Sequence, residues 1–281
     1  MIPPLPHDIV RDAVQRAFAE DITGAGDVTS LAVIPADRKA RFEIRARSNG
    51  LVCGLQPAME AFIQAGADLS LDVLANDGDP VEPGETVMSV DGPVRAIMLA
   101  ERTALNFLGR MSGIATLTRR YVDAVVGTKA KIVHTRKTTP GLRAFEIQAV
   151  RAGGGSPHRY NLSDAILIKD NHAAIAGSPA AAVRAARDQA GHMLRVSCEI
   201  DRLEDLASVM KAGADVVLLD NFTLEALRAA VVQAAGRVRL EASGGVTLET
   251  VGDIAQTGVD IISVGALTHS ATNFDFGLDA V

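Results

Sequence analysis

Cysteine is scarce in this sequence, and its placement indicates neither a disulfide framework nor a zinc site. The two cysteines, Cys53 and Cys198, lie far apart, and neither belongs to a Cys-x-x-Cys pair or to a cysteine and histidine spacing. A reducing compartment therefore fits best.

Long apolar runs are also missing. No stretch approaches the ~20 consecutive apolar residues that a membrane span requires. The first residues, from Met1 to Pro6, lack the charged region and the apolar core of a secretory signal. We therefore expect a soluble, cytoplasmic protein.

The sequence also has no excess of positive charge. The 281 residues include 28 Lys and Arg against 34 Asp and Glu, which gives a formal net charge of -6. Wrapping a nucleic acid or lying on an anionic membrane needs a net basic surface, so we expect neither partner. Because 48% of the residues are hydrophobic, the chain can bury one large core or two smaller ones, and its length favours two domains.

The N-terminal part of the chain is predicted to contain helices and a small sheet. Apolar residues at helical spacing predict a helix over residues 9–20, and alternating apolar and charged residues from Ala40 to Arg47 predict an antiparallel sheet. Helical spacing recurs from Val94 to Val126 and is interrupted at Ser112 and Gly113. This pattern predicts two consecutive helices that link the domains.

Beyond Lys131, short apolar runs alternate with capped helical segments, which is the rhythm of a parallel α/β sheet or barrel. The six predicted strands are Ile132 to Thr135, Ala165 to Lys169, Leu194 to Glu199, Val216 to Asp220, Arg239 to Ser243 and Ile261 to Gly265. The predicted helix starts are Ser178 before Pro179, Asp201 with Glu204, Thr223 and Thr247. A full eight-fold barrel needs more chain, so we expect an incomplete barrel in which the 136–164 insertion has a special role.

In such folds the C-terminal ends of the strands converge on one face, so side chains far apart in sequence meet there. The residues at these ends are charged or small: Arg136, Lys137, Lys169, Glu199, Asp220, Glu241, Ser243 and Gly265. We expect a functional site on this face.

The segment from His134 to Lys169 is the predicted anion-binding half of that site. From Lys131 to Lys169, seven Lys or Arg stand against two acidic residues, in a chain that is acidic overall. The run Gly153 to Gly155, close to His158 and Arg159, suggests backbone brought near a ligand. The alternatives are a solvated basic loop and a mobile glycine run.

Glu199 and Asp220 form the predicted acidic half, at the ends of adjacent strands. Such carboxylates can hold Mg²⁺ through its waters, bind sugar hydroxyls or stabilise a cationic carbon. Helix capping is the alternative role. It competes for Asp220, which precedes Thr223, whereas Glu199 stands two residues before a better cap, Asp201.

Small residues close the last two predicted strands. The segments from Ser243 to Gly245 and from Val264 to Ala266 open onto helix starts, an arrangement that offers backbone N–H groups to a terminal phosphate. The alternative is that both segments only form tight turns between strand and helix.

Several motifs together resemble quinolinate phosphoribosyltransferase, and the resemblance covers nearly the whole chain. The motifs are Gly26 to Ser30, Glu101 to Leu108, Ser112 to Thr116, Thr135 to Arg143, Leu167 to His172, Leu240 to Gly245 and Ile262 to Ser270. By this resemblance the protein transfers phosphoribosyl from phosphoribosyl diphosphate to quinolinate, and gives nicotinate mononucleotide, CO₂ and pyrophosphate in the de novo route to NAD. It would use Mg²⁺ and no organic cofactor.

The resemblance also implies a fold and an assembly. It implies an α/β protein with an N-terminal open α/β sandwich domain over residues 1–112 and a C-terminal incomplete parallel α/β barrel over residues 113–270. The tail, residues 270–281, would pack back on the first domain. The family forms homodimers, so Arg102 would enter the active site of the neighbouring subunit.

The resemblance further implies roles for individual residues. Contacts to the quinolinate carboxylates and the diphosphate would come from Thr135, Arg136, Lys137, His158, Arg159 and Lys169. Glu199 and Asp220 would lie near the ribose and the metal, and would stabilise positive charge at the ribose C1 carbon. Lys137 or Lys169 would protonate the ring after decarboxylation. The 5′-phosphate would lie against Ser243, Gly244, Gly245, Val264, Gly265 and Ala266.

The chain departs from the family pattern at several positions. The family usually has Asp, Lys, Tyr, Lys, Asn and Gly at the positions of His134, Ile147, Gln148, Ser156, Pro157 and Asn161. Because Pro157 adjoins His158, these departures bear on the geometry of that loop. The cations missing at 147 and 156 bear on substrate preference.

Three alternatives remain at this stage. A paralogous family linked to molybdate transport shares part of the motifs, but the string from Ile168 to His172 favours the quinolinate enzyme. A lyase would use Lys169 to form a Schiff base, since an apolar strand lowers a lysine's pKa. A non-catalytic barrel would only sense nucleotide or phosphoribosyl ligands.

Overall fold

The computed structural model describes residues 2–66 and 68–281, which divide into two compact units. Unit 1 contains Met1–Leu117, Thr139–Gly154 and Ala271–Val281, and unit 2 contains Thr118–Thr138 and Gly155–Ser270. The units therefore do not follow one boundary near residue 112, because the 139–154 segment groups with the N-terminal residues.

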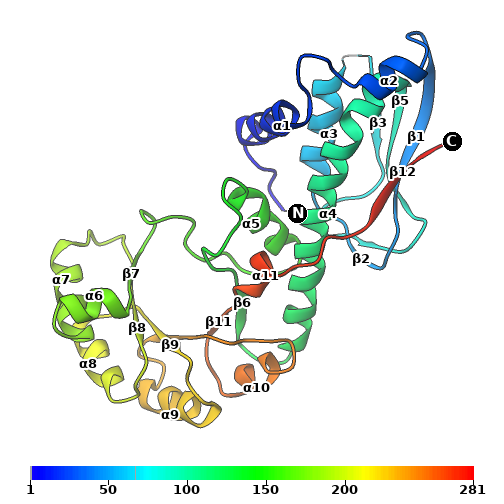
Figure 1. The fold of residues 1–281 in the computed structure, drawn as a ribbon. Coiled ribbons are helices and arrows are strands. Elements are labelled where there is room, and N and C mark those ends of the chain that lie inside the picture. The colour runs from blue at the N-terminus through cyan, green and yellow to red at the C-terminus, as the bar shows by residue number, and fades with distance from the viewer. Residues whose placement is uncertain (1, 67) are drawn as a thin grey trace. The chain divides into compact units, whose positions relative to one another are not determined.

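Unit 1 is built on an antiparallel sheet with the strand order β12-β1-β5-β3, next to a small pair formed by β2 and β4 (Figure 1). Phe42 of β1 pairs with Val90 of β5 on one side and with Ala280 of β12 on the other, so the C-terminal tail packs back on this sheet. The strands are β1 (Lys39–Ala46), β2 (Gly50–Leu51), β3 (Ser70–Val73), β4 (Pro80–Val81), β5 (Thr86–Pro93) and β12 (Phe276–Ala280). The helices are α1 (His7–Asp21), α2 (Val28–Val33), α3 (Leu55–Ala65), α4 (Val94–Ala124, shared with unit 2) and α5 (Arg143–Ala152).

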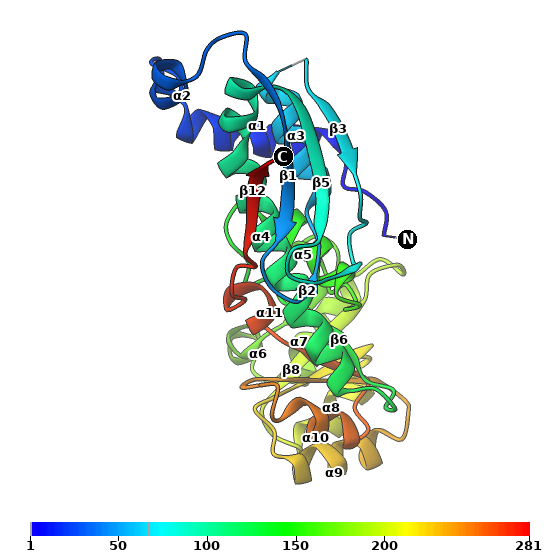
Figure 2. The same cartoon turned by 90° about the vertical axis from the view of Figure 1, so that its right-hand side faces the viewer.

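One face of this sheet carries the core of unit 1, and α1, α3 and α4 lie behind the sheet in Figure 2. Ile44 of β1 and Met88 of β5 are fully buried in one hydrophobic cluster with Phe62 of α3 and Ile97 of α4. Full burial of side chains of this size stabilises a fold by roughly 1.5–3 kcal/mol each. The alternating pattern predicted from Ala40 onward is therefore the pattern of a half-buried sheet.

Unit 2 is a parallel sheet in the order β6-β11-β10-β9-β8-β7, with helices between successive strands. Strands β6 and β7 stand at the two ends of this order, so the barrel is open, as the count of six strands predicted. The strands are β6 (Lys131–Val133), β7 (Ile166–Ile168), β8 (Val196–Ile200), β9 (Val216–Asp220), β10 (Arg239–Ser243) and β11 (Ile261–Ser263). The helices are α6 (Asp170–Ile175), α7 (Pro179–Gln189), α8 (Asp205–Ala212), α9 (Leu224–Ala234), α10 (Val251–Gln256) and α11 (Ala266–His269).

Two of the predicted helix caps are confirmed and two are wrong. The hydroxyls of Ser178 and Thr223 accept backbone N–H groups at the starts of α7 and α9. By contrast, α8 begins at Asp205, whose carboxylate accepts a hydrogen bond from Arg202, and Thr247 lies in a turn before α10. In both cases an extra turn precedes the helix, so the cap pattern in the sequence begins too early.

The prediction of two helices across 94–126 is also wrong, because α4 is continuous over 31 residues. Ser112 does not break the helix, since its Oγ accepts from Cys53 N at 2.8 Å and donates to Cys53 O at 3.0 Å. Gly113 gives the backbone of Thr272 room to approach, where a Cβ would collide with its carbonyl oxygen. Despite the length of α4, no helix in the described residues is long and apolar enough to cross a membrane.

Candidate active site

A cavity of about 770 Å³ lies at the C-terminal ends of the strands of unit 2. Every predicted site residue of unit 2 lines it except Val264, which is only 1% exposed and packs into the core. The predicted residues at the cavity are Thr135, Arg136, Lys137, His158, Arg159, Lys169, Glu199, Asp220, Ser243, Gly244, Gly245, Gly265 and Ala266. The strand order explains this convergence, because β6 to β11 all end on the same side.

One wall of the cavity is formed by two neighbouring arginines. The pKa of Arg159 is lowered from its usual value, first by burial and then by the positive charge of Arg136. The Nε atoms of both residues are buried and make no hydrogen bond within the described part of the chain. Buried donors without partners are costly, and an anionic ligand would satisfy both. The solvated-loop alternative does not fit these two arginines.

A second wall of the cavity carries the acidic residues. Lys169 and Glu199 extend from neighbouring strands, and Lys169 Nζ lies 3.2 Å from Glu199 Oε2. Asp220 ends β9 and its Oδ2 accepts from Asn221 Nδ2 at 2.8 Å. Helix capping does not explain Asp220, because Thr223 caps α9.

Two more residues line the cavity: Glu241, which the sequence analysis named among the strand ends without giving it a role, and Asn221, which it did not name. Glu241 is 2% exposed, its Oε1 accepts from Ser263 Oγ, and it lies 3.4 Å from His158 Nε2. A charged residue between the apolar Leu240 and Ala242 was the signal for Glu241, because a buried carboxylate needs partners.

The turn after β10 depends on glycine. Gly244 has φ +92° and Gly245 has φ +59°, which is the left-handed region that other residues rarely adopt. A Cβ on Gly244 would collide with the side chain of Asn221, itself at φ +55°. The backbone at Ser243 to Gly245 can therefore approach a ligand closely, as the phosphate interpretation requires.

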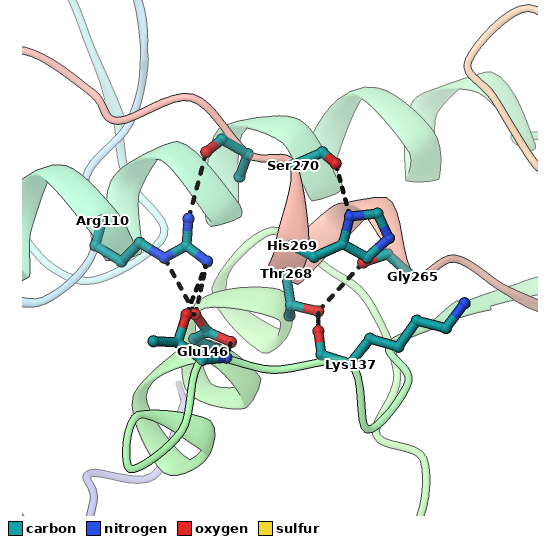
Figure 3. A network of polar contacts seen from close by, with 9 residues as sticks. Arg110, Lys137, Glu146, Gly265, Thr268, His269 and Ser270 are labelled. Atoms are coloured by element: carbon teal, nitrogen blue, oxygen red, sulfur yellow. Dashed lines mark hydrogen bonds and ion pairs between the residues drawn. The ribbon is translucent and has the colours of Figure 1, made fainter.

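Lys137 is fixed to the last helix of unit 2 through its backbone, as Figure 3 shows. Its carbonyl oxygen accepts from Thr268 Oγ1 at 2.8 Å, and Thr268 is fully buried. A Cβ on Gly265 would lie 3.2 Å from Lys137 Cδ, so the glycine leaves room for the lysine side chain. This arrangement directs Lys137 along the cavity wall.

Arg102 belongs to unit 1. It is exposed on α4 and lines a different cavity, of about 500 Å³, together with Arg16, Asn106 and Arg110. Arg110 in turn forms an ion pair with the fully buried Glu146 at 2.7 Å (Figure 3). The first cavity does not include Arg102 of the same chain.

The carboxylates provide a limited set of metal ligands. No group of three or more His, Cys, Asp or Glu side chains in residues 2–66 and 68–281 is placed to hold a metal ion. Glu199 and Asp220 fit Mg²⁺ only in the mode in which one or two carboxylates share the ion with water and substrate phosphates.

Comparisons with known proteins identify the family. The N-terminal domain of quinolinate phosphoribosyl transferase matches residues 27–112, and its C-terminal domain matches residues 114–279. The chain belongs to the quinolinate phosphoribosyl transferase family. It is 42% identical over 277 residues to the nicotinate-nucleotide pyrophosphorylase [carboxylating] of Mycobacterium leprae, covering 97% of both chains. It is 40% identical over 273 residues to a probable enzyme of that name from Bacillus subtilis, covering 97% of this chain and 94% of that one.

Solved structures agree with this family assignment. The nicotinate-nucleotide pyrophosphorylase of Francisella tularensis superposes with a TM-score of 0.95 at 38% identity, covering 100% of this chain and 99% of that one. The corresponding protein of Ehrlichia chaffeensis gives 0.94 at 36% identity, covering 99% and 100%. The predicted combination of an open sandwich domain and an incomplete barrel is thereby confirmed as the architecture of this quinolinate phosphoribosyl transferase family member.

Proposed function

We propose that the protein transfers the phosphoribosyl group of phosphoribosyl diphosphate to quinolinate and decarboxylates the product to nicotinate mononucleotide. Family membership supports the reaction class. The single observation that carries the proposal is the cavity itself, whose lining contains both the basic wall at Arg136 and Arg159 and the acidic wall at Glu199 and Asp220. Two polyanions need the first wall, and a transition state with positive charge on the sugar needs the second.

In the first step the pyridine nitrogen bonds to the ribose C1 carbon. The bond from C1 to the diphosphate oxygen breaks, and its electron pair leaves with pyrophosphate. Positive charge on the sugar rises as that bond breaks, and Glu199 and Asp220 stabilise it from the acidic wall. Arg136, Lys137 and Arg159 hold the anionic groups in place, which lowers the entropic part of the barrier.

In the second step the bond between the ring and its adjacent carboxylate breaks and releases CO₂. The positively charged ring nitrogen stabilises the electron pair that remains on the ring carbon, so no organic cofactor is needed. A proton must then reach that carbon, and Lys137 and Lys169 are the cationic lysines of the cavity.

Mg²⁺ would accompany the diphosphate and neutralise part of its charge. Glu199 and Asp220 would hold it, through its waters and together with the diphosphate oxygens. The 5′-phosphate would bind at Ser243 to Gly245 and Gly265 to Ala266. We place the reaction in the cytoplasm.

We also propose a homodimer in which Arg102 completes the active site of the neighbouring subunit. Two observations support this: Arg102 is exposed, and it lines a cavity of unit 1 rather than the catalytic cavity of unit 2. An arginine placed in this way can reach a carboxylate or phosphate of a substrate bound by another copy.

The lyase alternative is less well supported. Lys169 forms an ion pair with Glu199 and its side chain is 53% exposed, whereas a Schiff-base lysine is activated in a desolvated pocket or by a neighbouring cation.

An assay with carboxyl-labelled quinolinate, phosphoribosyl diphosphate and Mg²⁺ tests the proposal. The expected result is release of labelled CO₂ and pyrophosphate in equal amounts. Binding of phosphoribosyl diphosphate without pyrophosphate release would refute the proposal and would favour a ligand sensor.

A further inference from the structure

His134 is a buried histidine just beneath the cavity. It follows β6 directly, is 0% exposed and does not line the cavity. Its neighbour Thr135 does, as does His158, whose ring lies 6.4 Å from the His134 ring in an edge-on arrangement. A buried imidazole at this position must have hydrogen-bond partners, and those partners show what it holds.

Both ring nitrogens of His134 bond to the main chain. Nδ1 lies 3.0 Å from the carbonyl oxygen of Thr135, which can only accept, so Nδ1 carries the proton. Nε2 accepts the backbone N–H of His158 at 3.1 Å. These two contacts require one neutral tautomer and fix the ring between β6 and the loop that carries His158.

The same loop is attached to β6 at a second point. The N–H of Ser156 donates to the carbonyl of Ile132 at 2.8 Å, and Ser156 forms a parallel bridge with Val133. Pro157 follows; it has no N–H to satisfy and it favours an extended residue before it. Pro157 therefore lies between two anchored residues.

Beyond Pro157 the chain turns His158 and Arg159 into the cavity. The ring of His158 accepts the N–H of Arg159 at 2.7 Å and lies 3.4 Å from Glu241. The guanidinium of Arg159 donates to the carbonyl of Ala165 at 2.9 Å. The direction of both cavity side chains thus depends on where the His158 main chain is held.

We propose that His134 is a positioning residue that holds the His158 main chain and so directs His158 and Arg159 into the cavity. Its role in substrate binding rests on the proposed function. The residue does not touch a ligand itself, and it acts through the hydrogen bond between its Nε2 and the His158 N–H. A histidine that only filled the core would affect stability without affecting anion affinity.

Two substitutions distinguish the role of the acceptor atom Nε2 from that of the rest of the His134 ring. In His134→Gln an amide oxygen can take the place of Nε2, whereas in His134→Asn the shorter amide reaches the position of Nδ1 and leaves the His158 N–H without a partner. The exposed His192, outside the cavity, provides a matched control as His192→Asn.

Affinity is measured by calorimetry for quinolinate and, separately, for inorganic pyrophosphate. The anion that binds more weakly to Arg159→Ala than to the wild type is the one used to test the role of His134. For that anion we expect Kd to rise about tenfold in His134→Asn and to stay within about threefold of the wild type in His134→Gln. His192→Asn should leave Kd unchanged.

A double-mutant cycle then tests whether His134 acts through Arg159. In an Arg159→Ala background, the factor by which His134→Asn raises Kd should fall toward one, because the residue that His134 positions is gone. Any of three results would overturn the proposal. They are an equal rise in Kd from His134→Asn in both backgrounds, wild-type affinity in His134→Asn, and unchanged affinity for both anions in Arg159→Ala.

Spectroscopy of the wild-type chain tests the hydrogen bond independently of any variant that fails to fold. Nitrogen-15 spectra should show His134 as the neutral tautomer protonated at Nδ1, and the His158 amide should exchange slowly with solvent. Rapid exchange of that amide would sink the positioning role. Absence of quinolinate turnover in the wild type would instead refute the proposed function, while the pyrophosphate measurements would still decide the role of His134.

Discussion

Lys169 Nζ and Glu199 Oε2 lie 3.2 Å apart, at the ends of the neighbouring strands β7 and β8. The Lys169 side chain is 53% exposed and that of Glu199 is 14% exposed. An ion pair with one partner this exposed contributes about 0–1 kcal/mol to stability. The pair is therefore better explained by its position in the cavity than by a contribution to folding.

Glu199→Gln should separate these two roles. We expect kcat to fall by about 100-fold or more, because the amide cannot stabilise positive charge on the ribose. The free energy of unfolding should change by less than ~1 kcal/mol. Steady-state kinetics and urea denaturation measure the two quantities. Glu225→Gln makes the same chemical change on the exposed surface of α9 and should alter neither; an unchanged kcat in Glu199→Gln would contradict the assigned role.

Arg110 and Glu146 form the opposite kind of pair, which should matter for folding (Figure 3). Glu146 is 0% exposed and accepts from Arg110 Nη2 at 2.7 Å, from Thr139 N at 3.1 Å and from Thr139 Oγ1 at 2.8 Å. Removing one partner of such a pair typically costs 3–5 kcal/mol, so Glu146→Ala should destabilise the protein by about that amount in urea denaturation.

Glu146→Gln should destabilise the protein less than Glu146→Ala, because it keeps one acceptor oxygen for the groups that donate to Glu146, whereas alanine keeps none. The exposed Glu204 gives the matched surface control, and Glu204→Ala should stay within about 0.5 kcal/mol of the wild type. Equal stability of Glu146→Ala and Glu204→Ala would show that the buried pair does not hold the segment at Thr139.

Much of unit 2 could be predicted because its pattern is local. Strands β9 and β10 have the predicted bounds, since a buried parallel strand appears in the sequence as a continuous apolar run that ends in a polar residue. Because the strand ends were predicted correctly, Asp220 and Ser243 could be assigned to the site from the sequence alone, and both line the cavity.

The errors arose where distant residues decide the local structure. Gly113 suggested a helix break because its packing partner, Thr272, lies far away in the sequence. Glu241 was noticed only as a strand end, since its contacts with His158 and Ser263 depend on three different segments. Because Pro157 departs from the family pattern, the sequence did not determine the geometry of its loop. The hydrogen bond between His134 and His158 fixes that geometry, and it cannot be derived from either residue alone.

Asp77 predicts a pH dependence of stability. Its Oδ1 accepts the N–H groups of Gly54 at 2.9 Å and Leu55 at 3.1 Å, at the start of α3. Burial raises the pKa of Asp77 above its usual value, and these hydrogen bonds only partly oppose the shift. A raised pKa in the folded state gives stability that is present below the unfolded-state pKa and is lost as the pH rises through the folded-state value.

Asp77→Asn should therefore gain stability relative to the wild type as the pH rises from 4 to 7, because the amide accepts the same N–H groups without burying a charge. Asp77→Ala should be less stable than Asp77→Asn by about 1 kcal/mol at both pH values, since it removes the cap. Urea denaturation at the two pH values checks both expectations. A relative stability of Asp77→Asn that fell with rising pH would contradict the direction of the shift.

Arg102 predicts a result that depends on mixing two inactive proteins. Arg102→Ala and Glu199→Ala should each lose most activity, the first through substrate binding and the second through the acidic wall of the cavity. If Arg102 serves the neighbouring subunit, a mixed dimer has one site with both defects and one site with none. Random mixing in equal amounts makes half of the dimers mixed, so about a quarter of wild-type activity should return.

Arg102 acting within its own chain would give no recovery, because every site would then contain one defect. Mixing after mild denaturation and refolding, with each variant refolded alone as the control, measures the difference.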